Sequence, residues 1–267
     1  MLTSAFGTVG DIPYYIVCLS ARPTPLSRSH SGRLGGGVNP RPRHRLARVE
    51  YIALWYLVRP IGTDGRIMKL LVFSDLHRDR DAARSLVERA DEVDVLIGAG
   101  DFAVMRNGID DVIGILRGVD KPVVLVPGNG ESDVELREAC AGWPSAHVLH
   151  GEVVTLAGVP FYGIGGGIPV TPFGEWSFDL TDDEAEVLLA GCPEDAVLVS
   201  HSPPHGHVDE AGGRHVGSHA VLETVERVSP RLVVCGHIHG CWGQRSTIGA
   251  TVVLNAGPEG QVLELPE

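Results

Sequence analysis

The stretch MKLLVFSDLH, residues 68–77, places Asp75 and His77 directly after a short apolar run. Runs of this kind, rich in Leu and Val and bounded by charged residues, indicate a β-strand that is covered on both faces. Asp and His bind metal ions through oxygen and nitrogen. Because they are two residues apart on an extended segment, both side chains can turn toward one ion. Residues 68–77 therefore predict a strand that ends in a candidate metal site.

Four more apolar runs in the chain end in the same way. VDVLIGAG precedes Asp101, PVVLVPG precedes Asn129, DAVLVS precedes His201, and RLVVCG precedes His237 and His239. In open α/β sheets, ligands collect beyond the carboxyl ends of the strands, so side chains that are distant in sequence can meet there. We expect seven donors to converge in one crevice and to form a two-metal site: Asp75, His77, Asp101, Asn129, His201, His237 and His239.

Helical patterns alternate with the predicted strands. The first three helices are expected between strands in βαβ order, which implies parallel strands and right-handed crossovers. Residues 149–167 and 244–257 have the pattern of β-hairpins, so a second, mixed sheet is expected. Thr181 and Ser218 are predicted N-caps of the last two helices. The predicted helices occupy residues 81–90, 108–118, 132–140, 182–190 and 218–228.

The first 67 residues differ in composition from the rest of the chain. They contain nine Arg, no Lys and three acidic residues, for a net charge of +6, whereas residues 68–267 carry a net charge of −18. Residues 21–48 are rich in Arg, Pro, Gly and Ser and have no sustained periodicity. We interpret residues 1–67 as a disordered extension. Two alternatives are a basic targeting or nucleic-acid-binding arm, and a non-native segment that precedes a translation start at Met68. Residues 68–267 form the folded domain.

Composition and charge exclude several classes of protein. No apolar stretch reaches the roughly 20 residues that a membrane-spanning helix needs, so no membrane association is expected. Five Cys residues without a C-x-x-C pair argue against a disulfide framework and favour a reducing, cytoplasmic location. A nucleic-acid polymer is not expected as a substrate, because the acidic domain offers no basic surface for a phosphate backbone. The sequence does not indicate an oligomeric state.

The motifs DLH, GD, GN, SH and GHIH resemble, in their order and separation, the signature of the calcineurin-like metallophosphoesterase superfamily. The resemblance extends from Met68 to the C-terminus. Within it, residues 163–184 and 201–239 resemble a prokaryotic branch related to cyclic-nucleotide phosphodiesterases. The resemblance implies an α/β fold, a four-layer α-β-β-α sandwich of two mixed sheets flanked by helices. It also implies two divalent metal ions at the strand ends.

The resemblance further implies a dinuclear metal-dependent phosphoesterase. Its substrates would be phosphodiesters, including cyclic nucleotides, or small phosphate esters, attacked by a hydroxide that bridges the two ions. Asp101 suits the bridge between two cations about 3.5–4 Å apart, and nitrogen and oxygen ligands without thiolate favour Mn, Fe or Zn. The catalytic residues would be Asp101, Asn129 and His201. One ion would take Asp75, His77, Asp101 and His239, and the other would take Asp101, Asn129, His201 and His237.

One position departs from the superfamily pattern. Relatives usually have His, or in some branches Cys, after the Asn of the GN motif, and this chain has Gly130. In relatives that His helps to protonate the leaving oxygen, and general acid catalysis contributes about 10²- to 10⁴-fold in rate. Without this His, we expect the protein to hydrolyse esters with good leaving groups, to admit a bulkier substrate, or to use another acid such as His205 or His215. His205 and His215 are also candidate substrate contacts. A second hypothesis is an inactive protein of this fold that serves as an interaction scaffold.

Overall fold

The computed structural model describes residues 2–9, 12–19 and 67–265, and the structural statements below concern these residues. Most of the predicted extension at residues 1–67 lies outside them. Within the extension, the structure describes β1 (Leu2–Val9) and β2 (Ile12–Leu19), which pair as antiparallel strands. Because most of these residues are not described, the interpretation of residues 1–67 as a disordered or non-native extension stays a prediction.

The first of two large sheets has five strands. They are β3 (Lys69–Phe73), β4 (Val95–Gly98), β5 (Val123–Leu125), β6 (Ala146–Val148) and β15 (Gln261–Glu264). The spatial order is β15-β3-β4-β5-β6, in which β3 to β6 are parallel and β15 is antiparallel to β3. Three crossover helices join the parallel strands, as the sequence predicted. They are α1 (Arg80–Arg89), which continues into the short η1 (Ala90–Glu92), α2 (Asp110–Leu116) and α3 (Asp133–Cys140).

The second sheet has six strands. They are β7 (Glu152–Leu156), β8 (Val159–Ile164), β9 (Val197–Ser200), β12 (Leu232–Cys235), β13 (Arg245–Ile248) and β14 (Thr251–Asn255). The order is β13-β14-β12-β9-β8-β7, with a parallel centre and an antiparallel strand at each edge. The helices α4 (Asp182–Leu189) and α5 (His219–Val228) pack against this sheet. No helix among the described residues is long and apolar enough to cross a membrane.

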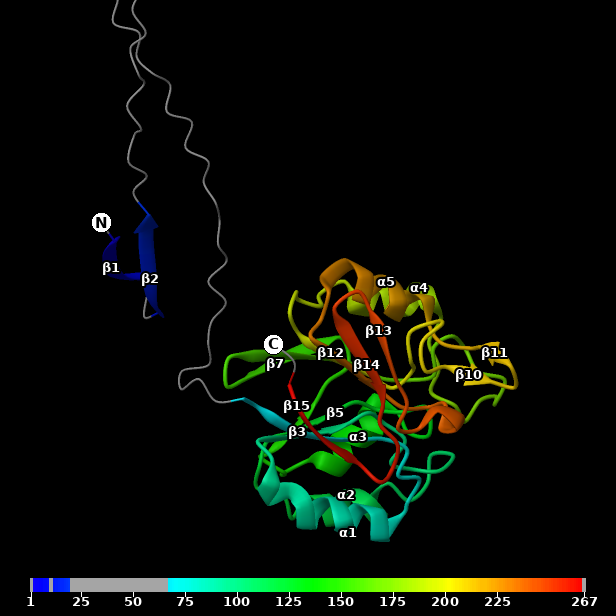
Figure 1. The fold of residues 1–267 in the computed structure, drawn as a ribbon. Coiled ribbons are helices and arrows are strands. Elements are labelled where there is room, and N and C mark those ends of the chain that lie inside the picture. Colours follow the sequence, from blue (N-terminus) through cyan, green and yellow to red (C-terminus); the bar gives the residue numbers. More distant parts are fainter. Residues whose placement is uncertain (1, 10–11, 20–66, 266–267) are drawn as a thin grey trace, which may run out of the picture. The chain divides into compact units, whose positions relative to one another are not determined.

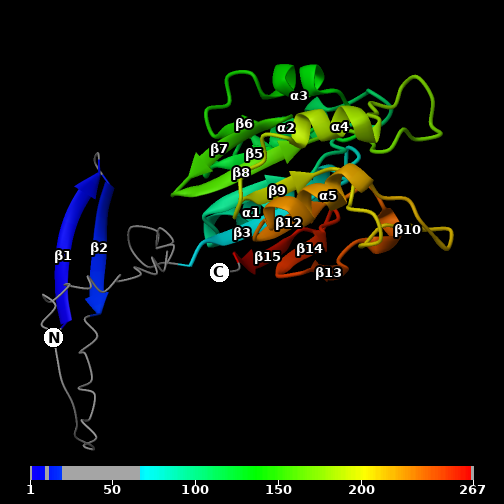
Figure 2. The same ribbon diagram turned by 90° about the horizontal axis from the view of Figure 1, so that it is seen from above.

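Alternate side chains of the central strands face different layers of the molecule. On β3, Leu71 and Phe73 pack in the cluster that includes α1, α2 and α3, whereas Leu70 and Val72 pack in the cluster between the sheets. On β9, Val197 and Val199 face the space between the sheets, and Leu198 packs with α4 and α5 on the opposite face. Figure 1 shows the resulting order of helices, sheet, sheet and helices, and Figure 2 shows the same layers from above, with α4 and α5 over the strands. The predicted four-layer sandwich of two mixed sheets is confirmed.

Most of the predicted elements are confirmed, with bounds that differ by a few residues. Thr181 and Ser218 are the N-caps of α4 and α5, and the side chain of each accepts a hydrogen bond from a backbone N–H of its helix. The two predicted hairpins are the antiparallel pairs β7–β8 and β13–β14. The sequence did not predict β6 and β15. These strands have three and four residues and no fully buried face, so their sequences carry too little pattern to predict them.

Removal of residues 1–67, so that the chain starts at Met68, should leave the sandwich intact. Among the residues whose side chains the structure describes, those of the three apolar clusters lie between Met68 and Leu265, and the deletion keeps all of them. We expect the melting temperature, followed by circular dichroism, to change by less than about 2 °C. An insoluble chain, or one that melts more than about 5 °C lower, would show that the extension belongs to the fold.

Candidate metal centre

The predicted ligands lie on loops at the carboxyl ends of strands from both sheets. The five-stranded sheet contributes the loops after β3, β4 and β5, and the six-stranded sheet contributes the loops after β9 and β12. The two sheets thus face one another with their ligand-bearing ends at a common edge. The structure brings together all seven predicted ligands: Asp75, His77, Asp101, Asn129, His201, His237 and His239.

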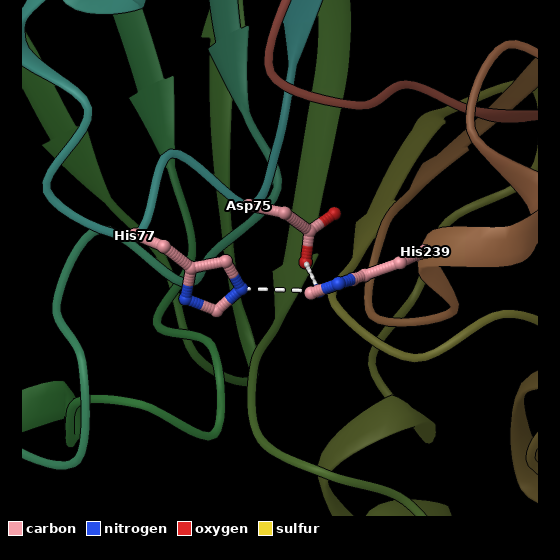
Figure 3. Close-up of side chains that lie close together, drawn as sticks. All are labelled: Asp75, His77 and His239. Carbon is pink, nitrogen blue, oxygen red and sulfur yellow. Dashed lines mark hydrogen bonds and ion pairs between the residues drawn. The ribbon is translucent and has the colours of Figure 1, made fainter.

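One group of potential ligands consists of Asp75, His77 and His239, and their ligand atoms all lie within 4.8 Å of one another. Figure 3 shows the two imidazole rings and the carboxylate turned toward one another. The Nε2 atoms of His77 and His239 are 3.0 Å apart, and Nε2 of His239 is 3.8 Å from Oδ1 of Asp75. Two imidazole nitrogens cannot both present lone pairs at this distance unless a proton or a cation lies between them. The group therefore fits a cation site.

A second group consists of Asp101, His201 and His237, again with ligand atoms within 4.8 Å of one another. The side chain of Asn129 extends this group, because its Oδ1 lies 3.2 Å from Nε2 of His201. Asp101, Asn129 and His201 are buried, whereas His77 and His239 of the first group reach the surface. The second group is thus the more enclosed of the two.

The carboxylate of Asp101 lies between the two groups. Its Oδ2 is 3.5 Å from Nε2 of His77 in the first group, and its Oδ1 is 3.5 Å from Nε2 of His201 in the second. The backbone N–H of Gly130 also donates a hydrogen bond of 2.7 Å to Oδ1. This position is the one that a carboxylate bridging two cations would occupy.

Four of the seven predicted ligands have a left-handed backbone. The φ angles are 54° at Asp75, 43° at His77, 60° at Asp101 and 66° at His237. Residues other than Gly seldom adopt this conformation, and such strain concentrates at functional sites. The left-handed residues turn the chain sharply after each strand, which directs the side chains toward the common edge.

The glycines next to these ligands are required for two different reasons. Gly100 has a φ of +90°, which favours Gly, and an added Cβ would lie 2.6 Å from His201. Gly128 does not have a left-handed backbone, but its added Cβ would lie 2.0 Å from Oδ1 of Asp101. Close approach of the chain, rather than turn geometry, thus excludes a side chain at Gly128.

Backbone carbonyls determine which nitrogen of two histidines faces the centre. Nδ1 of His201 lies 2.7 Å from the carbonyl oxygen of Ala99, and Nδ1 of His77 lies 3.3 Å from that of Ala103. A carbonyl oxygen only accepts, so each Nδ1 carries the proton and each Nε2 presents its lone pair. This is the tautomer in which Nε2 binds a metal ion, with the opposite nitrogen held by an oriented partner.

The electrostatics of the centre favour the metal-binding protonation states of Asp101 and His237. Burial acts to raise the pKa of Asp101, but His201 and His77 outweigh it and hold that pKa below its usual value. Burial, together with His201, lowers the pKa of His237 to about 3. Burial acts to lower the pKa of His201, but Asp101 and Asp75 more than offset this effect and raise it. At neutral pH, Asp101 is therefore ionised and His237 is neutral, as metal ligands must be.

Ser177 and Asp179 orient Asn129, and the sequence analysis missed both residues. Nδ2 of Asn129 donates a hydrogen bond of 3.0 Å to Oγ of Ser177, which in turn donates one of 2.7 Å to Oδ1 of Asp179. This arrangement holds the amide with its oxygen toward His201. No local pattern could have revealed the link, because Ser177 lies 48 residues after Asn129.

Glu131 is a third residue that the sequence did not indicate. Its buried carboxylate accepts hydrogen bonds from the backbone N–H groups of Asp101 (2.9 Å), Ala103 (2.8 Å) and Gly128 (2.7 Å). Burial, with a contribution from Asp101, raises the pKa of Glu131 to about 7, although the N–H donors act to lower it. Glu131 thus joins the loops after β4 and β5. In the sequence, Glu131 is noticeable only because it follows the GN motif within the stretch GNGES, residues 128–132.

Asp75 is likewise fixed by neighbours that the sequence did not indicate. Its Oδ2 accepts hydrogen bonds from Oγ of Ser74 and from Nε1 of Trp242, the latter at 3.0 Å. Its Oδ1 accepts from the backbone N–H of His237 at 3.0 Å. Asp75 therefore connects the loop after β3 to the loop after β12, across the two sheets.

The structure gives a steric reason for Gly130. A Cβ at this position would lie 2.9 Å from the backbone oxygen of Ala103 and 3.2 Å from Oδ1 of Asp101. The carbonyl of Ala103 is the group that orients His77, so it cannot move without consequence for the ligands. The φ angle of Gly130 is not left-handed. A side chain at this position would therefore require the loop 101–103 to shift.

The structure does not place His205 and His215 at the metal centre. Nδ1 of His215 lies 2.6 Å from Oδ1 of the buried Asp209, and His205 stacks on His219 with ring centroids 4.0 Å apart. The hydrogen bond to Asp209 raises the pKa of His215. These histidines belong to the loop that contains β10 (Glu210–Ala211) and β11 (Arg214–His215). The geometry offers no support for their predicted contact with substrate.

A cleft of about 280 Å³ opens onto the ligands. Its floor contains members of both ligand groups, and its sides are apolar. The η2 turn (His239–Cys241) contributes His239 to the lining. The residues that line the cleft are His77, Asp101, Ala103, Val104, Met105, Asn129, Gly130, Phe173, Trp176, His237 and His239.

Glu131→Gln should destabilise the protein. An amide has one oxygen in place of two, and its NH₂ group would face a backbone N–H that needs an acceptor. A buried donor left without a partner costs about 1–3 kcal/mol, so we expect the free energy of unfolding in urea to fall by about that amount. Glu186→Gln, on the exposed side of α4, is the matched control and should change it by less than about 0.5 kcal/mol. Equal stability of the two variants would contradict the anchoring role of Glu131.

The chain is similar in sequence or fold to several known proteins. UPF0046 protein K07C11.7 of Caenorhabditis elegans is 29% identical over 218 residues, which are 73% of this chain and 71% of that protein. Among solved structures, TT1561 of Thermus thermophilus has a TM-score of 0.60 at 18% identity, over 75% of this chain and 100% of that chain. A dimetal phosphatase from Danio rerio has a TM-score of 0.54 at 15% identity, over 75% of this chain and 93% of that chain. At these identities the two structures show a shared fold.

The sequence also matches a protein family. The calcineurin-like phosphoesterase superfamily domain matches residues 68–265. This range contains both large sheets, their helices and all seven predicted ligands. The fold and the order of the motifs along it agree with the match. The chain therefore belongs to the calcineurin-like phosphoesterase superfamily.

Proposed function

We propose that the protein is a dinuclear metal-dependent phosphoesterase. The observation that carries this function is the presence of two ligand groups at one edge of the sandwich, with the Asp101 carboxylate between them. Both groups consist of nitrogen and oxygen donors, which supports Mn, Fe or Zn as the ions. One ion would be held by Asp75, His77, Asp101 and His239, and the other by Asp101, Asn129, His201 and His237.

The chain's own residues prepare the site for this chemistry. When bound, the two ions would activate a water molecule and neutralise the charge on the phosphoryl oxygens. The backbone carbonyls of Ala99 and Ala103 hold His201 and His77 with Nε2 toward the centre. Ser177 holds the amide oxygen of Asn129 in the same direction. We assign Asp101, Asn129 and His201 as the catalytic residues, because they would bind the ions that contact the substrate.

The charge of the cleft supports phosphodiesters as substrates over phosphomonoesters. None of the residues that line the cleft in the described part of the chain is Lys or Arg. A monoester carries up to two negative charges and is usually bound with the help of basic side chains. A diester carries one, which the metal ions alone could balance. Together with a volume of about 280 Å³, this favours small phosphodiesters and disfavours a nucleic-acid polymer. A relation to cyclic-nucleotide phosphodiesterases stays a prediction.

The absence of an imidazole at Gly130 restricts the leaving group. Without a general acid beside Asn129, the departing oxygen leaves with little help, so esters with stable leaving groups should react best. Gly130 also favours the second candidate function, an inactive protein that uses this fold as an interaction scaffold. Metal content and hydrolysis of an activated diester distinguish the two functions.

The cysteines support the proposal that the protein is cytoplasmic. Cys140, Cys192, Cys235 and Cys241 are free thiols and are buried. Burial raises the pKa of Cys140 to about 12 and that of Cys192 to about 11, so neither forms a reactive thiolate. Unpaired, unreactive thiols are typical of proteins in a reducing compartment.

Protein that is purified without metal and reloaded with Mn²⁺ should contain close to two ions per chain by elemental analysis. Histidine ligands bind in the neutral form and the pKa of His201 is raised, so the affinity should already weaken as the pH falls below about 7. The loaded protein should hydrolyse bis-p-nitrophenyl phosphate, whose leaving group needs little protonation. A metal content near zero would end the enzymatic proposal, and two ions without hydrolysis would support the scaffold.

Asp101→Asn should lower kcat/KM for bis-p-nitrophenyl phosphate at least about tenfold more than Asp75→Asn. The reason is that Asp101 faces histidines of both ligand groups, whereas Asp75 belongs to one. Elemental analysis should show fewer ions in the Asp101 variant than in the Asp75 variant. The exposed Asp120, replaced by Asn, provides a control with unchanged activity. Small and equal losses in the first two variants would mean that the bridge is misassigned.

A further inference from the structure

We infer that the cleft selects phosphate esters whose organic group is a flat aromatic ring. This inference rests on the proposed function and adds a substrate class to it. The geometry that points to it is a set of four apolar side chains beside the ligands: Val104, Met105, Phe173 and Trp176. We call these side chains the apolar rim.

The apolar rim leaves large hydrophobic side chains in contact with water. Val104 is 38% exposed, Met105 is 52% exposed and Phe173 is 50% exposed. Scattered apolar residues on a surface need no explanation, but a group of them beside a polar cleft is typical of a ligand site. The floor of the cleft would hold the phosphate. The organic part of the ester would then lie against the rim and cover it.

The two aromatic rings of the rim are already stacked. The ring centroids of Phe173 and Trp176 are 5.6 Å apart, and the ring planes are inclined by 15°. Trp176 therefore supports Phe173 and limits the orientations of its ring, although Phe173 remains half exposed. A third flat ring could extend the stack, because offset parallel rings attract one another. A saturated group of the same size could not make this contact as well.

Both loops that carry the rim are fixed to the metal centre. In the first loop, the backbone N–H of Arg106 donates a hydrogen bond of 2.8 Å to the carbonyl of Gly130, and Nε of Arg106 donates one of 2.7 Å to Glu135. In the second, the N–H of Phe178 donates one of 2.9 Å to the carbonyl of Asn129. The rim is thus held at a set position relative to the ligands, which reduces the ordering that binding requires.

The chemistry of the rim indicates what it can distinguish. Apart from the indole N–H of Trp176 and the weakly accepting sulfur of Met105, its side chains carry no hydrogen-bonding group. Such a surface binds flat, apolar groups by stacking and burial, and it makes few hydrogen bonds to polar atoms at the edge of a ring. We therefore expect strong discrimination between aryl and alkyl esters and weak discrimination among aromatic groups, as in stacking on single-stranded nucleotides.

Binding of three phosphonates to the full chain loaded with Mn²⁺ tests the inference. Methyl-, cyclohexyl- and phenylphosphonate carry the same headgroup and differ only in the organic group, and their affinities can be measured by isothermal titration calorimetry. We expect phenylphosphonate to bind about tenfold more tightly than methylphosphonate, with cyclohexylphosphonate in between. This ratio in the unaltered protein does not depend on the folding of any variant.

Variants then locate the selectivity. Phe173→Ala should weaken the binding of phenylphosphonate about five- to tenfold and leave that of methylphosphonate unchanged. Phe173→Leu retains apolar volume without the ring, so it should remove the preference for phenyl over cyclohexyl. Val170→Ala is the matched control, because Val170 is an exposed apolar residue of the same loop that does not line the cleft.

The outcomes separate a failure of the rim from a failure of the metal centre. If all three phosphonates bind the unaltered protein within about twofold of one another, or if cyclohexylphosphonate binds as well as phenylphosphonate, the inferred selectivity is wrong and the phosphoesterase proposal remains. An equal loss of affinity for all three probes in Phe173→Ala would also overturn it. If no phosphonate binds the loaded protein, the inferred selectivity is wrong, and hydrolysis of bis-p-nitrophenyl phosphate decides the phosphoesterase proposal separately.

Discussion

The carboxylate of Asp101 is a buried negative charge that needs partners from both sheets. Burial of an ionised group is costly unless the group is paired and hydrogen-bonded. Here the partners are His77 on one sheet, His201 on the other and the backbone N–H of Gly130. Many local features follow from this arrangement. The chain near Asp101 passes too close to Gly128 for that residue to carry a side chain, and Glu131 ties the loops after β4 and β5 together. The sandwich brings these loops within reach of the loops after β9 and β12.

The parts of the structure that could be predicted from the sequence are those with a local pattern. Apolar runs such as LLVF in β3 are buried on both faces, so their hydrophobicity is continuous, and the polar residues that follow them stand out. The parts that could not be predicted from the sequence lack such a pattern. Glu131 and Ser177 resemble ordinary loop residues, and only the folded chain shows that they hold Asp101 and Asn129. β15 is a strand because β3 offers it an unpaired edge, which its own four residues do not indicate.

Gly130 shows how a single departure from a family pattern can have more than one meaning. From the sequence, it indicates a lost acid or a wider cleft. In the structure, the space that a side chain would need is partly occupied by the carbonyl of Ala103. That carbonyl also determines the tautomer of His77. The identity of residue 130 is therefore coupled to the conformation of the loop after Asp101, so a change at this position cannot be considered apart from that loop.

The origin of the ligands has a consequence for the lifetime of the protein. Each ligand group combines side chains from both sheets: His239 joins Asp75 and His77, and Asp101 joins His201 and His237. A bound ion would therefore cross-link the two halves of the sandwich. Ligands that bind only the folded state stabilise it by mass action, by about 2.7 kcal/mol at a free concentration of 100 times the dissociation constant. The supply of metal in the cell would thereby control how often the sheets separate, and with it how quickly proteases remove the chain.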